Sequence, residues 1–422
     1  MRRPETTPGI LLLAIVAIMA LSTAGCLGET PVDIGWATPP GSAISGTEQE
    51  IQQLFDTYTQ ALVARDRDAF LSLIDAGNPD FLARQQQFFD YTENIPFDRY
   101  SITLDSLSEA DDGSITAKTS EAFTLKGSFA ALPDADRAGY RLVRHDDGWK
   151  LAGDATLQAL GKERDARLWD LGKVEVAIGE HAIVLYHAAG EAVAGQAGGD
   201  VDRAYAQLTE ALPGAEMPLV PVWVFSGKEQ IDQAYPGQWQ DWVGGASRQL
   251  GYDEEQGGEI ILDARLFNEI GSYDPEYNRK MIAHELTHVA LFSRTGDTTP
   301  SFLVEGLADF VAGLEATPYL AGKLRNGETI SPTLRDLYYP SGFNVLISDE
   351  AATLAYEIAD TAVAYLEREY GNEKVVMLLR EFKRRELDTQ PQEQLVDEVF
   401  RSVLGVGTDE FENGWRLYVL KG

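Results

Sequence analysis

A chain of 422 residues with 44% hydrophobic and 24% charged side chains has the composition of a soluble globular protein and the length of two or three domains. Its 67 acidic and 35 basic residues give a formal net charge of −32, which argues against nucleic acid or anionic lipid as a partner, because both are polyanions. An acidic surface also serves solubility, so the charge alone identifies no substrate.

The amino terminus has the three parts of a secretory signal. Two arginines follow Met1, an apolar stretch covers residues 10–21, and small residues lead into Cys26. We expect residues 1–25 to be a signal peptide that takes no part in the fold. Cys26 is the only cysteine, so the exported part can form no internal disulfide.

The small residues before Cys26 resemble a bacterial lipoprotein signal, in which the cysteine is acylated and becomes the first mature residue. The resemblance implies a lipid anchor on Cys26 that holds the protein at the extracytoplasmic face of the cell membrane. Thr23 stands where that pattern usually has an aliphatic residue, which leaves an uncleaved membrane anchor or ordinary secretion as alternatives. Residues 26–47 are rich in Gly, Pro, Ser and Thr and predict a flexible tether.

Residues 48–165 predict a first domain of the α+β class, with helices before strands. The two helices are expected at 51–62 and 69–74, and the strands at 100–104, 115–119, 140–144 and 149–151. The helix pair and the closing Gly148-Trp149-Lys150-Leu151 resemble the cone-shaped nuclear transport factor 2-like fold. Domains of that fold more often bind or dimerise than catalyse, so no chemistry is assigned to it.

The second predicted domain covers residues 172–422 and places a small sheet before a mainly helical part. A helix is expected at 201–212, and strands at 174–178, 182–186, 219–225 and 259–262.

The run His284-Glu285-Leu286-Thr287-His288 follows this sheet. Asp274 before Pro275 predicts a helix start, with a helix over 275–294. Residues four apart on a helix differ by about 40° around its axis, so both imidazoles can reach one metal ion. Glu285 lies about 100° from His284 and can reach a water on that ion. The other histidines, expected to be structural, are His145, His181 and His187.

Thr299 before Pro300 predicts a second helix by the same logic, and Glu305 and Asp309 share one face of it. If the two helices pack together, Glu305 can be a third ligand and leave a fourth position for water, as catalytic zinc requires. Gly306 would allow the close helix approach. Asp309 can accept the outer N–H of a ligand histidine and so orient it.

These residues are similar to gluzincins, the class of zinc peptidases that includes thermolysin and the M-type aminopeptidases. In that class a Glu on the next helix is the third ligand and an acid four residues later supports the site, as Glu305 and Asp309 would here. The run 300–308 is especially similar to the peptidase MA-like subgroup. A metzincin would need a Gly and a third His after His288, and residues 289–294 contain neither.

The resemblance implies a zinc-dependent peptidase acting on a peptide or protein substrate. One Zn²⁺ on His284, His288 and Glu305 would activate a water and polarise the peptide carbonyl. Glu285 would take the proton of that water and return it to the leaving amine. Asp309 would then support His284.

Two further roles follow from the same resemblance. Residues 259–262 resemble the edge strand that pairs with an extended substrate in this class, with a buried structural strand as the alternative. The developing oxyanion would take a hydrogen bond from Tyr356, with Tyr338 or Tyr339 next in line. A core tyrosine is the more common explanation for Tyr356, because its helix has a strong apolar stripe.

The Gly-rich residues 242–246 lie where aminopeptidases of this class carry a Glu that holds the amino terminus of the substrate. No Glu follows at 247–249, which favours an endopeptidase. One alternative is an inactive, peptidase-like binding lipoprotein, although an intact Glu285 argues against it. The other is a structural zinc, which usually has four protein ligands, and no fourth ligand or cysteine stands near the motif.

Overall fold

The structure is a computed structural model that describes residues 46–110, 113–129, 134–154, 166–237, 239, 243–250, 257–265, 275–314, 317–343, 346 and 348–421. The predicted signal peptide, Cys26 and almost all of the predicted tether lie outside these residues. Among the helices that are described, none is both long enough and apolar enough to cross a membrane.

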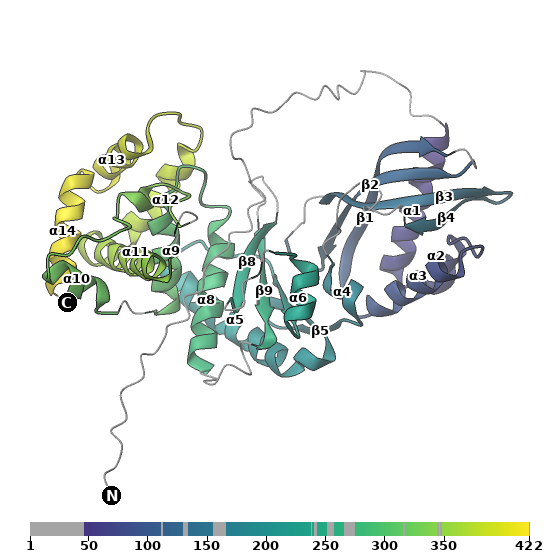
Figure 1. Cartoon of the computed structure of the whole chain (residues 1–422), viewed down its shortest axis with the longest axis horizontal. Helices are drawn as coiled ribbons and strands as arrows, with labels where there is room; N and C mark the ends of the chain where they lie inside the picture. The colour runs from purple at the N-terminus through teal and green to yellow at the C-terminus, as the bar shows by residue number, and fades with distance from the viewer. Residues whose placement is uncertain are drawn as a thin grey trace, which may run out of the picture.

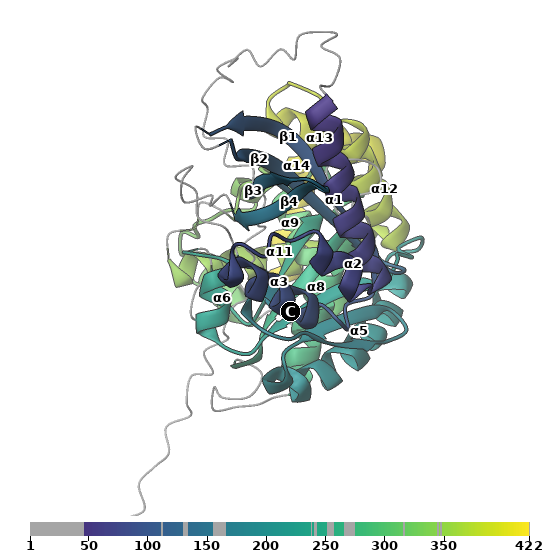
Figure 2. The same ribbon diagram turned by 90° about the vertical axis from the view of Figure 1, so that its right-hand side faces the viewer.

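The amino-terminal unit packs three helices against a four-stranded antiparallel sheet with the strand order β1-β2-β3-β4 (Figure 1). Its elements are α1 (Gly46–Ala64), α2 (Arg67–Ser72), α3 (Pro79–Tyr91), β1 (Phe97–Glu109), β2 (Ile115–Leu125), β3 (Asp134–His145) and β4 (Gly148–Asp154). Figure 2 shows α1 beside the strands of this sheet. Helices followed by antiparallel strands match the predicted α+β class, while the nuclear transport factor 2-like assignment stays a prediction.

Helix α3 is the element of this unit that the sequence analysis missed. Asn78 caps it by accepting a hydrogen bond from the Phe81 amide at 3.2 Å, and Pro79 occupies the first turn. The pair Asn78-Pro79 is therefore the same start signal as Asp274-Pro275, and it was available in the sequence.

A five-stranded mixed sheet forms the middle of the molecule, with the strand order β5-β6-β7-β9-β8. The three inner strands are parallel, and the two outer ones run antiparallel to their neighbours. The strands are β5 (Glu175–Ile178), β6 (Ala182–Tyr186), β7 (Val220–Phe225), β8 (Gly245–Leu250) and β9 (Gly257–Asp263). Helices α5 (Glu191–Ala211) and α8 (Pro275–Leu291) cover one face of this sheet.

Residues 259–262 form a buried structural strand, the second of the two alternatives, and not the edge strand. They belong to β9, which pairs with β7 on one side and β8 on the other, so its backbone groups are already used. The edge next to β9 is β8, which the sequence analysis did not predict. Its sequence, from Gly245 to Leu250, has none of the β-branched or aromatic residues that mark strands.

The amino-terminal unit packs against the other face of the five-stranded sheet, and Ile231, Tyr235 and Trp239, which follow β7, also pack there. Phe123 of β2 lies 5.3 Å from Trp169 and 6.3 Å from Trp223 of β7, measured between ring centroids. Trp169 belongs to the short helix α4 (Leu168–Leu171), and its ring is 5.8 Å from that of Trp223. These side chains lie in one continuous hydrophobic cluster with the core of the amino-terminal unit, so the two units share a core.

The carboxy-terminal part is helical, as predicted, and the whole chain is of the α+β class. Its elements are α9 (Ser301–Ala312), α10 (Tyr319–Arg325), α11 (Asp349–Tyr370), α12 (Asn372–Arg384), α13 (Gln392–Val403) and α14 (Thr408–Lys421). Helix α6 (Lys228–Ala234) lies earlier, after β7.

Helix α9 packs between α8 and α11. A Cβ atom at Gly306 would lie 2.2 Å from the Ala359 carbonyl oxygen and 2.8 Å from a Val363 methyl group. Gly306 therefore allows a close helix crossing, as expected, but the neighbour is α11 rather than α8.

Candidate metal centre

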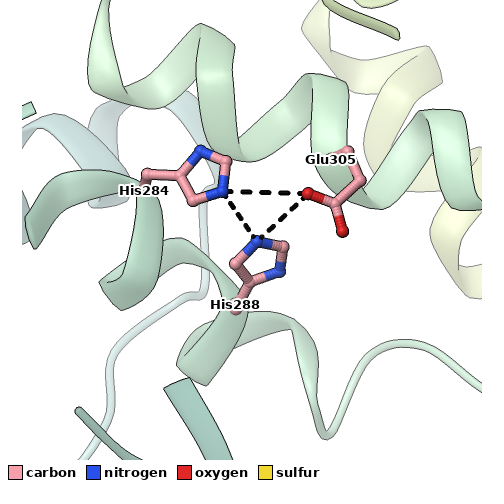
Figure 3. A group of neighbouring side chains, drawn as sticks. All are labelled: His284, His288 and Glu305. Atoms are coloured by element: carbon pink, nitrogen blue, oxygen red, sulfur yellow. Dashed lines mark hydrogen bonds and ion pairs between the residues drawn. The ribbon is translucent and has the colours of Figure 1, made fainter. Parts of the chain in front are cut away.

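Two imidazoles of α8 point toward the same place. His284 and His288 are one helical turn apart, and the two residues are only 1% and 3% exposed. Their Nε2 atoms are 3.1 Å apart. Figure 3 shows both rings directed at the carboxylate of Glu305. The predicted cap of α8, Asp274, lies outside the described residues.

Glu305 reaches this place from α9. Its Oε2 atom lies 3.8 Å from Nε2 of His284 and 3.6 Å from Nε2 of His288 (Figure 3). Two ligand atoms that are each about 2.1 Å from a tetrahedral zinc ion lie roughly 3.4 Å apart, so the three observed separations fit one such ion. Within the part of the chain that the structure describes, these three residues are the group found to suit a metal ion.

The start of α9 differs from the prediction in detail. The helix begins at Ser301 after Pro300, and the Thr299 hydroxyl accepts a hydrogen bond from the Gly296 amide at 3.1 Å. Thr299 therefore stabilises the turn between α8 and α9 instead of capping α9. That turn sets the position of Glu305 relative to the two histidines.

Buried carboxylate oxygens support the assignment of a cation to this site. Oε2 of Glu305 and both Oε atoms of Glu285 are buried and, among the described residues, have no hydrogen-bond partner. Burying an ionised carboxylate without a partner is costly, since the group loses its hydration. A metal ion and a water beside it would supply the missing interactions.

Asp309 lies beside Nδ1 of His284, while Nε2 of the same ring faces Glu305. Its Oδ1 atom is 2.8 Å from Nδ1 of His284, although the ring N–H is not directed along this line. The structure thus brings Asp309 next to His284, the partner that the resemblance implied. Burial raises the pKa of Asp309 to about 8, against an opposing effect of His288.

The two histidines differ in their titration. Burial and, after it, the charge of His288 lower the pKa of His284 to about 4, against the opposing charges of Glu285 and Glu305. Its ring is therefore neutral at pH 7, the form that binds metal. Burial also acts to lower the pKa of His288, but the charge of Glu305 and the other carboxylates outweighs it, so the pKa is raised.

Glu285 faces the edge of the middle sheet. On the same side of α8, Met281 lies against Gly245 of β8 and Phe292 against Gly258 of β9. Glu285 is fully buried between these two contacts along the helix. Burial and the charge of Glu285 raise the pKa of Tyr277 to about 12, which places this tyrosine near the same carboxylate. The sequence analysis missed Tyr277.

Tyr356 is half-buried on α11, with its ring centroid 4.9 Å from that of Phe343. It shares a helix face with Ala359 and Val363, the residues that contact Gly306 of α9. The structure therefore places Tyr356 on the side of α11 that faces α9. Its role as oxyanion donor stays a prediction.

The two reserve candidates for the role of oxyanion donor, Tyr338 and Tyr339, have other surroundings. Tyr338 is buried in the helical core, where its hydroxyl donates to Glu412 of α14 at 3.1 Å. Tyr339 is 43% exposed and turned away from that core.

The remaining histidines have structural contacts. His145 lies 3.1 Å from Asp75, and His187 bonds the Leu168 carbonyl oxygen at 2.9 Å. His181 stacks on Tyr205 with 3.8 Å between ring centroids. None of the three is in the metal group found among the described residues.

Comparison with known proteins adds little to this geometry. No protein-family model matches the sequence, and no curated protein matches it. Among solved structures, the chain is similar to an M1 zinc metallopeptidase from Deinococcus radiodurans, with 14% sequence identity and a TM-score of 0.31. The match covers 76% of this chain and 61% of that one, and similarity this weak supports no inference about the reaction.

Proposed function

We propose that this protein is a zinc-dependent peptidase of the gluzincin type. The observation that carries the proposal is the set of three buried ligand atoms on α8 and α9, at separations that suit one tetrahedral ion, with the unpartnered carboxylate of Glu285 on the next position of α8. A structural site would need a fourth protein ligand, and none completes the group among the described residues.

Each residue of the site has its own role in the proposed hydrolysis of a peptide bond. Zinc held by His284, His288 and Glu305 would supply Lewis acidity, which activates a water and polarises a carbonyl. Glu285 would take the proton of the attacking water and give it to the leaving amine. Asp309 would hold the ring of His284 in place. Tyr356 is the proposed donor to the developing oxyanion.

An extended peptide is the substrate that best suits the neighbouring sheet. Among the described strands, β8 pairs with β9 alone and forms the edge of the sheet, the position where an extended peptide would add as a further strand. This edge lies beside α8, where Met281 contacts Gly245. Residues 243–250 contain no carboxylate to bind a free amino terminus, so we propose an endopeptidase.

We also propose an extracytoplasmic location, with a lipid anchor on Cys26. Support comes from the charged start, the apolar stretch and the small residues before Cys26, all in the sequence. The mass of the mature amino terminus tests this proposal. An unmodified Met1, or cleavage at another residue, would exclude lipidation.

The proposed reaction is tested by replacing its general base. The zinc-loaded protein is incubated with a mixture of peptides, and cleavage is followed by mass spectrometry for the wild type and for Glu285→Gln. We expect the substitution to retain zinc and to lower the cleavage rate by about 10²–10⁴-fold, the usual contribution of a general base. Glu276→Gln, an exposed carboxylate on the same helix, is the matched control and should keep full activity.

Two results would contradict the proposal. Equal cleavage by the wild type and Glu285→Gln would exclude Glu285 as the base. A zinc-loaded wild type that binds peptides but cleaves none would instead indicate an inactive, peptidase-like binding lipoprotein.

A further inference from the structure

Unpartnered polar atoms concentrate around the metal centre. Among the described residues, ten buried side-chain nitrogen and oxygen atoms have no hydrogen-bond partner, and five of them belong to Asn278, His284, Glu285 and Glu305. Native proteins leave few such atoms, and each calls for an explanation. The metal and its water explain the oxygen atoms of Glu285 and Glu305, and Nδ1 of His284 lies 2.8 Å from Asp309. Neither explains Nδ2 of Asn278.

Asn278 lies on the same side of α8 as Glu285. At 100° per residue, two positions seven apart differ by roughly 20° around the helix axis and by about 10 Å along it. Met281 and Phe292 lie within roughly 60° of Asn278 by the same geometry and contact β8 and β9. Asn278 is therefore on the side of α8 that faces the edge of the sheet, near the start of β8.

Asn278 is only 4% exposed, and among the described residues its Nδ2 group has no acceptor. A buried amide N–H without an acceptor destabilises the folded state. An apolar side chain of similar size, such as leucine, would avoid this cost at a purely structural position. A buried donor without an acceptor among the described residues, on the same side of α8 as Glu285, is instead suited to an acceptor on a bound molecule.

We propose that Asn278 is a substrate-binding residue whose Nδ2 group donates a hydrogen bond to a backbone carbonyl oxygen of the bound peptide. A peptide added to the sheet beside β8, its edge strand among the described residues, would pass Gly245 and Glu285. Its carbonyl groups are the neutral acceptors that an amide N–H suits. The contact holds the substrate in register with Glu285 and needs no particular substrate side chain. This inference rests on the proposed peptidase function.

The test combines enzyme kinetics and stability on the zinc-loaded protein, with Asn278→Leu as the main variant. We expect KM for peptide substrates to rise about five- to tenfold, the loss of one hydrogen bond, with kcat within about twofold of the wild type. Zinc content should not change. The midpoint of thermal unfolding should stay the same or rise, because an unpaired buried donor has been removed.

Asn78→Leu is the matched control, since the Nδ2 group of Asn78 already has a partner. That group donates to the Ala152 carbonyl oxygen at 2.9 Å, and the side chain caps α3. The control should therefore lower the unfolding midpoint and leave KM unchanged. Asn278→Leu is therefore expected to raise KM without lowering the unfolding midpoint, and Asn78→Leu to lower the unfolding midpoint without changing KM.

Three results would overturn the inference. An Asn278→Leu protein with wild-type KM would show that Asn278 does not bind substrate. If both Asn278→Leu and Asn278→Ala fail to fold, the residue is structural. If the zinc-loaded wild type cleaves no peptide, the proposed function fails and the inference fails with it, a result that the wild-type assay distinguishes from the other two.

Discussion

Asp309 is the residue outside the ligand set on which metal binding should depend most. It lies 2.8 Å from Nδ1 of His284 and is buried, so no water can easily replace it. We predict that Asp309→Ala weakens zinc binding by about 10- to 100-fold, as removal of such supporting groups usually does. Titration against a competing chelator measures the effect. Asp309→Asn should lose less affinity, and equal affinity in all three proteins would contradict the predicted role.

Glu357 gives the fold a dependence on pH that is separate from the metal centre. Its carboxylate accepts hydrogen bonds from the Leu320 amide, at 2.7 Å, and from the Thr317 hydroxyl. Burial, with a further contribution from Asp360, raises its pKa from the ordinary 4.5 to about 7. The folded state thus binds this proton more tightly than the unfolded chain, and stability falls as the pH rises between these two values.

We predict that Glu357→Gln removes this loss, because the amide has the same shape and does not ionise. Relative to the wild type, its free energy of unfolding should rise by about 2 to 3 kcal/mol between pH 5 and pH 8. Urea unfolding of both proteins at the two pH values gives this difference. A constant difference across that range would show that Glu357 keeps an ordinary pKa.

At the residue level, helical spacing was sufficient to predict which side chains of each helix could reach one metal ion. Residues 284 and 288, and likewise 305 and 309, share a helix face through the helical repeat alone. Tyr277 and Asn278 have no such signal, because their importance comes from β8 and from Glu285, which tertiary packing brings near them. Tyr338 failed as a candidate for the same reason, since its partner Glu412 is 74 residues away along the chain.

At the scale of elements, the crossing of α9 and α11 controls where Glu305 lies. We predict that Gly306→Ala forces these helices apart, because its Cβ would be 2.2 Å from a backbone oxygen, which cannot move as a side-chain end can. The shift should lower the thermal midpoint and weaken zinc binding, since Glu305 is the adjacent residue.

Gly195→Ala on α5 is the matched control for this substitution. A Cβ at Gly195 has no neighbour within 4 Å among the described residues, so alanine should be neutral or slightly stabilising there. Calorimetry and zinc titration on both variants compare them. Equal behaviour would mean that the α9–α11 crossing does not hold Glu305 in place.

Strand order is the element-level property that the sequence did not reveal. Residues 259–262 are apolar because β9 is an inner strand, and the pairing of β9 with both β7 and β8 depends on contacts far apart in the chain. The weak pattern of β8 hid the edge strand. By contrast, α1 and the four strands of the first sheet were predictable. The apolar residues of α1 follow the helical period of about 3.6 residues, and those of the strands alternate with polar residues.

At the scale of the whole molecule, the two units share one hydrophobic cluster. Phe97 and Phe123 of the amino-terminal unit pack against Trp169 and Trp223 in the shared cluster. We predict that a fragment starting at residue 166 aggregates, since it would expose the apolar patch around these two tryptophans. Size-exclusion chromatography of the fragment tests this, and a monomeric fragment with full zinc content would contradict a shared core.

The central claim is that His284, His288 and Glu305 hold one zinc ion. The most direct measurement is the metal content, by mass spectrometry, of the freshly purified protein without its predicted signal peptide, compared with His288→Ala. We predict one zinc per chain in the wild type and almost none in the variant. A wild type without zinc, or a variant that holds as much zinc as the wild type, would contradict the claim.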